Sequence, residues 1–460
     1  MGPRSPAARS ALIAAAAAIG GFLFGFDTAV INGTVAALTQ EFHASEVAIG
    51  LTVSAALIGC AIGAYVAGSA ADRYGRTRTM AITALVFVAS GILSGAALSL
   101  VDLALWRLLG GFAIGAASVI APAYIAEIAP AKLRGRLGSL QQLAIVIGIF
   151  AALLGDYALA RIAGSARQPL AFGLPAWRWM FWTEVLPAVL YGLAAFCIPE
   201  SPRWLVGQGR EAEARAILAS LGEDPDTKLP EIRESIEGQH VTRLRDLRGA
   251  GFAGVQRIVW IGLGVAVLQQ LVGINVIFYY SSVLWQSVGF SEHDALFVTV
   301  ITSVTNILTT LIAIASVDRF GRRPLLLVGS VGMALSLGSL GLLFSRASVD
   351  AAGNVLLAGT SGIAALIAAN VFVFCFGFSW GPVVWVLLGE MFPNRIRAKA
   401  LAVGATAQWV ANFFVTATFP ALQKLGLGLA YGVYALAAVV SVVFVARWVP
   451  ETRGKELEAM

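Results

Sequence analysis

The sequence predicts an all-α membrane protein of twelve transmembrane helices, in two pseudo-symmetric six-helix bundles with short cytoplasmic helices between them. Three observations lead to this fold class. The chain of 460 residues is 58% hydrophobic and only 13% charged, and its mean hydropathy of +0.80 lies outside the usual range of soluble globular proteins. Its apolar residues gather into long runs, and three loop motifs occur twice in the same order.

The apolar runs have the length that a bilayer requires, since about 20 consecutive apolar residues form a helix that crosses the hydrocarbon core. Twelve runs reach this length, at residues 10–36, 47–70, 78–98, 102–127, 138–160, 177–198, 256–286, 294–316, 324–344, 359–389, 399–420 and 428–448. The first run lacks a convincing cleavage site. We therefore interpret it as a retained helix and not as a signal peptide.

The loops between these runs alternate in charge. One set contains the basic residues Arg73, Arg76, Arg78, Lys132, Arg134, Arg136, Arg319, Arg322, Arg323, Arg395, Arg397 and Lys399. The other set contains the acidic residues Glu41, Glu46, Asp102, Glu292 and Asp294 and only a few bases. Because basic loops tend to remain in the cytoplasm, the pattern predicts a multi-pass protein of the plasma (inner) membrane with both termini in the cytoplasm.

The loop motifs describe an internal repeat of six helices. Residues 72–76 (DRYGR) and 318–322 (DRFGR) follow the second and eighth runs, residues 127–135 and 390–398 follow the fourth and tenth, and Pro199-Glu200 and Pro450-Glu451 follow the sixth and twelfth. Such matched pairs indicate two halves in parallel orientation. We expect an N-terminal bundle at 1–200, a cytoplasmic linker at 201–250 with an amphipathic helix near 210–221, a C-terminal bundle at 251–448 and a short cytoplasmic tail at 449–460.

Composition excludes several classes of function. The net charge of +6 does not indicate a nucleic-acid partner, because the basic residues form short clusters that suit loops at an anionic leaflet. The three cysteines, Cys60, Cys197 and Cys375, lie in apolar runs with no disulfide or metal-binding spacing. There is no nucleotide loop or nucleophile constellation. We therefore expect a protein of the lipid bilayer that is not an enzyme and holds no metal or cofactor.

Two charges lie inside apolar runs. Asp27 is the only formal charge between residues 11 and 38, and Arg107 lies just inside the run that opens at Leu103. A charge at such depth is costly unless it is neutralised, paired or hydrated, so it indicates a functional site. Both residues fall in the outer halves of their helices, which allows a contact between them. An acid that gains and loses a proton beside a permanent cation can couple proton movement to transport.

The seventh run contains amides where the membrane offers no water. Gln269, Gln270 and Asn275 lie in a stretch without any charge, beside Gly273. Such amides must face protein or a cavity, and the glycine allows the helix to break there. Asn275 and Tyr279 share a helix face at a spacing of four residues. Polar partners and an aromatic ring suit a monosaccharide, although hydrogen bonding between helices is an alternative role for these amides.

These motifs identify a family resemblance. The carrying residues are Gly25-Phe26-Asp27-Thr28, both DRxGR loops, PESPRWL at 199–205, QQLVGINVIFYYS at 269–281 and PETRGK at 450–455. With them the chain resembles the sugar porter family of the major facilitator superfamily over essentially its whole length. It is similar to bacterial sugar–proton symporters of the xylose and glucose type.

The resemblance implies roles for further residues. It implies sugar contacts at Gln142, Gln269, Gln270, Asn275, Tyr279 and Asn306, and an aromatic platform at Trp385, which with Trp380 flanks an expected helix break at Gly381-Pro382. In the eleventh run, Gln408 and Asn412 are four residues apart with Trp409 adjacent, and we add Gln408 and Trp409 to the candidate sugar site. Glu184 is implied as a proton relay, with local helix anchoring as its alternative role.

The remaining charges suggest a cytoplasmic gate. By resemblance, Asp72, Arg76, Glu127, Arg134, Glu200, Asp318, Arg322, Glu390, Arg397 and Glu451 form a network between the halves. Exposed ion pairs contribute only about 0–1 kcal/mol each. A network that exists in only one conformation can nevertheless bias a two-state equilibrium.

We therefore predict a proton-coupled monosaccharide symporter that works by alternating access as a monomer, with D-glucose as the first substrate candidate. Xylose or galactose are alternative substrates, because hexoses and pentoses share most contacts. A facilitative uniporter is the second hypothesis, but facilitative relatives usually carry asparagine in place of Asp27. A sugar sensor is the third, although such sensors carry long cytoplasmic tails and we expect only about a dozen residues after the last helix.

Overall fold

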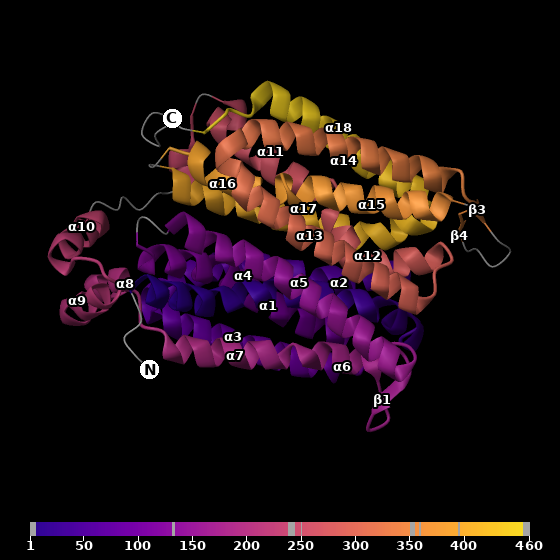
Figure 1. Cartoon of the computed structure of the whole chain (residues 1–460), viewed down its shortest axis with the longest axis horizontal. Helices are drawn as coiled ribbons and strands as arrows, with labels where there is room; N and C mark the ends of the chain where they lie inside the picture. The colour runs from indigo at the N-terminus through magenta and orange to yellow at the C-terminus, as the bar shows by residue number, and fades with distance from the viewer. Residues whose placement is uncertain are drawn as a thin grey trace.

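Long helices form almost the whole structure, a computed structural model that describes residues 6–130, 134–237, 244–249, 251–349, 355–357, 360–393 and 396–453. The indigo-to-magenta helices lie on one side of the molecule and the orange-to-yellow helices on the other (Figure 1). We call these sides the N-terminal half, residues 6–200, and the C-terminal half, residues 251–453. The short helices α8, α9 and α10 lie together at one end of the molecule (Figure 1).

The N-terminal half contains seven helices and one hairpin. They are α1 (Pro6–Glu41), α2 (Glu46–Tyr74), α3 (Arg76–Gly95), α4 (Leu100–Ile128), α5 (Arg134–Ala163), α6 (Ala176–Thr183) and α7 (Val185–Cys197), with β1 (Pro169–Ala171) paired antiparallel to β2 (Leu174–Pro175). Helices α6 and α7 together form the sixth span, which is interrupted at Glu184.

The C-terminal half repeats the long helices and interrupts two of them. Its elements are α11 (Arg257–Leu271), α12 (Ile274–Ser287), α13 (Glu292–Phe320), α14 (Arg322–Ser345), α15 (Ser361–Gly377), α16 (Trp380–Met391), α17 (Arg397–Leu425) and α18 (Leu427–Trp448), with the hairpin strands β3 (Ser348–Val349) and β4 (Val355–Leu356). The seventh span is divided into α11 and α12, and the tenth into α15 and α16.

Twelve segments of the described chain are long and apolar enough to cross a membrane, which confirms the predicted number. The predicted break in the seventh span is present at Gly273, whose φ of 80° lies in the left-handed region. The break in the tenth span was predicted at Gly381-Pro382, and this position is wrong. It lies at Ser379, and Pro382 falls in the first turn of α16, where a proline is tolerated because its missing N–H has no partner in the helix.

The linker between the halves contains several short helices, as predicted. The amphipathic helix expected near 210–221 is α9 (Glu211–Ser220), but α8 (Pro202–Gly207) and α10 (Pro225–Glu237) accompany it. Two single-turn 3₁₀ helices follow, η1 (Leu244–Leu247) and η2 (Phe252–Gly254). Leu205, Leu218 and Leu229 pack into a small apolar cluster between the three helices. Packing of this kind stabilises helices that are too short to persist alone.

Glycines allow α2 and α4 to approach at backbone distance. A Cβ atom on Gly111 would lie 1.8 Å from the carbonyl oxygen of Ala56, and one on Gly59 would lie 2.0 Å from that of Leu108. Side chains are therefore excluded from this contact, which is typical of helix packing in membranes.

The two ends of the molecule differ in charge. We call the end that contains Arg76 and Arg322 the basic end and the end that contains Glu46 and Glu292 the acidic end. At the basic end, the Tyr124 hydroxyl donates to the carbonyl of Pro199 and links the ends of two spans. Serines cap helices at the acidic end, where Ser45 and Ser291 accept backbone N–H groups at the starts of α2 and α13.

Candidate functional site

A buried ion pair joins α1 to α4. Asp27 is 0% exposed and Arg107 is 2% exposed. Arg107 donates from Nη1 to Asp27 Oδ1 at 2.5 Å and from Nη2 to the backbone carbonyl of Asp27 at 3.1 Å. The contact that the sequence allowed is therefore formed. Because neither partner is hydrated, removal of either one leaves an uncompensated buried charge.

Glu184 adds a second acid to this pair. It is 1% exposed and lies near Asp27 and Arg107. Asp27 Oδ2 and Glu184 Oε1 are both buried without a hydrogen-bond partner among the described residues. Two buried carboxyl groups therefore accompany one guanidinium, and one bound proton would leave the three groups without net charge.

Proline explains why Glu184 lies at a helix interruption. Pro187 has no N–H to donate to the carbonyl of Thr183, four residues earlier, and its ring disfavours a continuous helix at that point. Helix α6 ends at Thr183, and α7 begins at Val185. Glu184 itself, with φ of -64° and ψ of -26°, lies between the two helices.

The amides of the seventh span form a connected chain at the helix break. Gln269 donates to the carbonyls of Trp380 at 2.7 Å and Gly381 at 3.3 Å, so it ties α11 to the break in the tenth span. Gln270 donates to Gln269 Oε1 at 3.4 Å, and Asn275 donates to Gln270 Oε1 at 2.5 Å. Gln269 is thus occupied by backbone carbonyls, whereas Gln270 and Asn275 bond to each other and can exchange that bond for a sugar hydroxyl.

Tyr279 connects this cluster to α17. It is 4% exposed and lies near Asn412 of α17, which accepts from the Thr416 hydroxyl at 3.0 Å. Gln408 lies one turn earlier, is 8% exposed, and its Oε1 has no partner within the described chain. Gln408 therefore offers a buried acceptor that a ligand could satisfy.

The tryptophans near the candidate site differ in how they contact the rest of the protein. The ring of Trp409 lies 5.7 Å from that of Phe24, a contact between α17 and α1 and hence between the halves. Trp380 is fully buried and donates to Leu326 and Ser330, so it serves packing. Trp385 is 39% exposed, and within the described chain its ring makes no aromatic contact. Its role as a platform for sugar stays a prediction.

Two further predicted contacts lie outside the hydrogen-bonded amide cluster. Gln142 of α5 is half-buried, and its buried neighbour Gln141 packs on Gly21 of α1. Asn306 of α13 is buried beside Gly377, at the end of α15. The structure does not connect either residue to Gln270 or Asn275 by a direct hydrogen bond among the residues it describes.

The halves contact each other at the acidic end. Asn32 of α1 donates from Nδ2 to the carbonyl of Phe278 at 2.9 Å and to the Ser281 hydroxyl at 3.0 Å, both in α12. Other contacts between the halves lie nearby, namely Glu46–Lys424 at 3.1 Å, Ala166 N–H to Glu292 at 2.8 Å and the rings of Tyr157 and Phe297 at 5.7 Å. The acidic end is therefore closed in this conformation.

Ion pairs at the basic end lie within each half and repeat each other. In the N-terminal half, Arg76 binds Glu127 through two bonds of 3.1 and 3.0 Å and Asp72 at 3.0 Å, and the N–H groups of Arg76 and Thr77 donate to Glu200. In the C-terminal half, Arg322 binds Glu390 at 3.0 and 2.7 Å, and the N–H groups of Arg322 and Arg323 donate to Glu451. These bonds all lie within one half of the protein or the other.

Glycine makes the repeated arrangement possible. Gly75 and Gly321 have φ values of 96° and 91°. A Cβ atom there would lie 2.4 Å from the carboxylate of Glu200 and 2.8 Å from that of Glu451. The side chains of Arg134, Asp318 and Arg397 lie outside the described residues, so their part in a network between the halves stays a prediction. Among the described residues, no ion pair crosses between the halves at the basic end.

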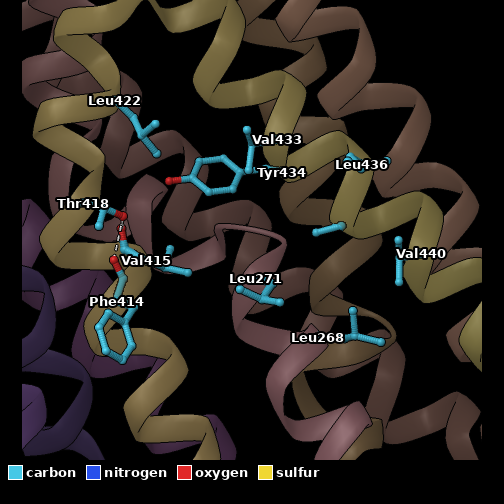
Figure 2. A pocket seen from close by; sticks show the side chains of 11 residues that line it. Leu268, Leu271, Phe414, Val415, Thr418, Leu422, Val433, Tyr434, Leu436 and Val440 are labelled. Atoms are coloured by element: carbon cyan, nitrogen blue, oxygen red, sulfur yellow. Dashed lines mark hydrogen bonds between the residues drawn. The ribbon is translucent and has the colours of Figure 1, made fainter.

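An apolar cavity of about 350 Å³ lies in the C-terminal half, between α11, α17 and α18. Figure 2 shows the Tyr434 ring directed toward Leu422 and Thr418 of α17, with Leu271 of α11 on another wall. Nearly all of its lining is apolar. A sugar site requires several convergent polar groups, so this cavity does not compete with the amide cluster.

Sequence reasoning overlooked two polar residues in the spans. Asn32 lies within the first apolar run, five residues after Asp27, and Asp156 lies within the fifth. The argument that identified Asp27 as a candidate applies equally to Asp156, because an ionisable residue at membrane depth is rare unless it has a function. Asn32 lacks a charge, and only its contacts with α12 mark it as a gate residue.

Comparisons with known proteins agree with this geometry. A family model described as sugar (and other) transporter matches residues 13–460. A glucose transport protein of Synechocystis sp. is 58% identical over 452 residues, covering 98% of this chain and 96% of the relative. The D-xylose-proton symporter of Escherichia coli K12 is 38% identical over 480 residues, covering 96% of this chain and 93% of the relative.

A solved structure resembles the whole fold. The partially occluded inward-open conformation of the xylose transporter from Escherichia coli superposes with a TM-score of 0.83 at 35% identity, covering 97% of this chain and 99% of that chain. In the present structure the acidic end is closed, and no ion pair joins the two halves at the basic end among the described residues.

Proposed function

Because the chain belongs to the sugar (and other) transporter family, within the sugar porters of the major facilitator superfamily, we propose that it is a proton-coupled monosaccharide symporter. The observation that carries the coupling is the buried group of Asp27, Glu184 and Arg107. A uniporter requires no titratable acid at membrane depth, whereas a symporter must hold and release a proton there.

The charge balance of this group suggests how coupling works. With one proton shared between Asp27 and Glu184, the group is neutral. Entry of a proton to Asp27 weakens its bond to Arg107 and frees α1 to move against α4. Loss of the proton restores the ion pair. Because an ion pair of this kind is strong only when desolvated, each protonation state favours one arrangement of the two helices.

The substrate site of this proposal is the amide cluster at the break between α11 and α12. Gln270, Asn275, Tyr279 and Gln408 supply donors and acceptors, and Gln269 holds the break of the tenth span in register. Breaks in spanning helices expose backbone polar groups to a cavity and are typical of substrate sites in transporters. D-Glucose is the substrate that we favour, since the relative at 58% identity is a glucose transport protein.

The remaining parts of the proposal concern the setting of the chain. We place the basic end in the cytoplasm of a cell bounded by a plasma membrane, because the basic loops cluster there. We assign residues 1–200 and 251–448 to the two moving bundles, residues 201–250 to a cytoplasmic linker and residues 449–460 to a tail. The chain would act as a monomer, since one copy contains both halves of the site.

Facilitated diffusion through the same site is the alternative, and one experiment separates the two. The purified protein is reconstituted into vesicles, and uptake of labelled glucose, xylose, galactose and fructose is measured with and without an imposed pH gradient. The proposal predicts that glucose accumulates above its external concentration only when the gradient is present. Equilibration without accumulation under both conditions would establish the uniporter, and uptake of another sugar alone would correct the substrate.

A further inference from the structure

Asp156 is a second buried acid that the coupling group does not use. It lies on α5 and is 1% exposed. Its Oδ2 accepts the backbone N–H of Gly33 in α1 at 3.1 Å. A Cβ atom on Gly33 would lie 2.7 Å from the Asp156 carboxyl group, so the carboxyl packs directly on the bare α1 backbone. Seven residues separate Asp156 from the end of α5, which places it about 10 Å inside the helix end.

No cation accompanies Asp156 among the described residues. The charged or titratable groups on α5 and on the helices that pack against it near this end are Asp27 and Glu41 of α1, Asp102 and Arg107 of α4, Tyr157 and Arg161 of α5, Arg178 of α6, Glu184 between α6 and α7, and Glu292, His293 and Asp294 of α13. None of them forms an ion pair or hydrogen bond with Asp156 in the described chain. Arg107 is committed to Asp27, Arg178 to Glu41 and Arg161 to Tyr157.

The neutral acid is therefore the form that fits this environment. An ionised carboxylate with one N–H donor and no counter-ion costs several kcal/mol when it is buried. A protonated carboxyl makes the same bond to Gly33 and carries no charge. Asp27 differs, because Arg107 balances it.

Asp156 also lies where the halves meet. Gly33 follows Asn32, which binds Phe278 and Ser281 of α12. The next residue of α5, Tyr157, contacts Phe297 of α13. When the acidic end opens, α1 and α5 separate from α12 and α13, and water reaches the region of Asp156. Hydration removes most of the cost of ionisation.

We propose that Asp156 is a second titrating residue of the transporter, which binds a proton when the acidic end closes and releases it to the same side when that end opens. The proton enters from water at the acidic end as H⁺ onto a carboxylate oxygen and returns to that water, so it is not transported. Low pH then favours the closed acidic end and high pH favours the open one. The part that this protonation plays in a transport cycle rests on the proposed function. Its effect on the equilibrium between the open and the closed acidic end does not.

Distance measurements test this inference without any transport. Spin labels are attached at Glu46→Cys and Lys424→Cys. The two native side chains are exposed and face each other across the closed end, where Lys424 Nζ lies 3.1 Å from Glu46 Oε1. Cys197→Ser removes the exposed native thiol, while Cys60 and Cys375 are buried. All proteins carry Asp27→Asn and Glu184→Gln, which eliminate titration of both acids of the coupling group. We call the labelled protein with these two substitutions the background protein. Electron-spin distance distributions are recorded from pH 5 to pH 9.

The background protein should shift toward the separated population as pH rises, by up to about tenfold in the open-to-closed ratio per pH unit for one linked proton. Addition of Asp156→Asn, which keeps the shape and can still accept from Gly33, should remove the shift and leave the end closed. Addition of Asp294→Asn instead, at an acid at the start of α13 that accepts from the Ser291 hydroxyl, should leave the shift unchanged. A flat profile in the background protein, or an equal shift after Asp156→Asn, overturns the inference.

Infrared spectroscopy provides an independent measurement. The background protein should show the carbonyl stretch of a buried protonated carboxyl group, and this band should be absent after addition of Asp156→Ser. An unchanged band assigns the proton elsewhere and overturns the inference. If glucose uptake proves to be uncoupled from protons, the proposed function fails while both measurements still decide whether Asp156 titrates.

Discussion

Asn32 and Ser282 bind each other twice across the two halves of the protein. The Ser282 N–H donates to Asn32 Oδ1 at 3.1 Å, and the Ser282 hydroxyl donates to the Asn32 carbonyl at 2.5 Å. Together with the bonds from Asn32 to Phe278 and Ser281, they satisfy the whole amide in a site that is 0% exposed. This contact joins α1, which contains Asp27, to α12, which contains Asn275.

Asn32→Ala should open the acidic end. It removes three buried hydrogen bonds, each with a net contribution of about 0.5–1.5 kcal/mol, so the open population should rise roughly tenfold or more. Labels at positions 46 and 424 report the change. Thr34→Ala is the matched control, since that hydroxyl bonds only to the carbonyl of Ile31 in its own helix. Equal distance distributions for Asn32→Ala and Thr34→Ala would show that the amide does not hold the gate.

Gln270→Ala and Asn275→Ala should each weaken sugar binding while the protein remains folded. A site built to bond a hydroxyl loses about 1–3 kcal/mol when one partner is missing, which corresponds to roughly 5- to 150-fold in affinity. Calorimetric titration of glucose in detergent measures the change. Asn370→Ala, an amide of α15 that bonds the carbonyl of Leu366, serves as control. Wild-type affinity in both test variants would move the substrate site elsewhere.

Arg134→Ala combined with Arg397→Ala should shift the resting population further toward an open basic end. The two arginines occupy equivalent positions in the repeated motifs, and the predicted network joins the halves only when the basic end is closed. Labels at Tyr74→Cys and Phe320→Cys, both exposed and at equivalent positions, report the distance between the halves. An unchanged or shorter distance would argue against a gating role.

Glu451→Gln should lower thermal stability at neutral pH and lose this effect in acid. Burial acts to raise the pKa of Glu451, but the N–H groups of Arg453, Arg322, Arg323 and Thr452 outweigh it and hold the pKa below its ordinary value of 4.5. The stabilisation by a depressed pKa is present above the unfolded value and disappears as pH falls through the folded value.

The melting temperatures of wild type and Glu451→Gln should therefore differ at pH 7 and converge below about pH 4.5, when measured by fluorescence in detergent. Glu223→Gln changes an acid of the linker that receives no such backbone donors among the described residues, and it should leave the melting temperature unchanged at both pH values. A constant difference between wild type and Glu451→Gln across this range would mean that the carboxylate charge is not the cause.

The sequence predicted the features that depend on the free-energy cost of polar groups in a membrane or on local backbone geometry. The number of spans and the pairing of Asp27 with Arg107 depend on how expensive polar groups are in a membrane. The break at Gly273 depends on a residue that adopts positive φ freely. The break in the tenth span was misplaced by two to three residues, because a proline such as Pro382 is compatible with either the end of one helix or the first turn of the next.

Other features could be identified only from the three-dimensional arrangement of the helices. Glu184 could have been a helix anchor, and only the packing of α6 and α7 against α1 places it beside Asp27. The pairing of Arg76 with Glu127 and Glu200 within one half depends on the conformation that the protein adopts. The sequence also offered Gln142 and Asn306 as members of one site, but neither forms a direct hydrogen bond with Gln270 or Asn275 among the described residues. Gln142 lies on α5 in the other half, and Asn306 of α13 packs beside Gly377.

Coupling through Asp27 sets a limit on accumulation. One proton that enters down a potential of 100 mV supplies about 2.3 kcal/mol, and each 1.4 kcal/mol corresponds to a tenfold concentration ratio. One proton per sugar therefore supports roughly 40-fold accumulation before any pH gradient is added.

Asp27→Asn tests this claim most directly, because the amide retains the shape of the side chain but cannot titrate. In vesicles of one preparation, sugar accumulation driven by an imposed proton gradient and sugar–sugar exchange without a gradient are both measured. The account predicts that Asp27→Asn abolishes accumulation while sugar binding and exchange persist, since exchange requires no net proton movement. Continued accumulation in response to the gradient would contradict the account and assign the transported proton to another residue.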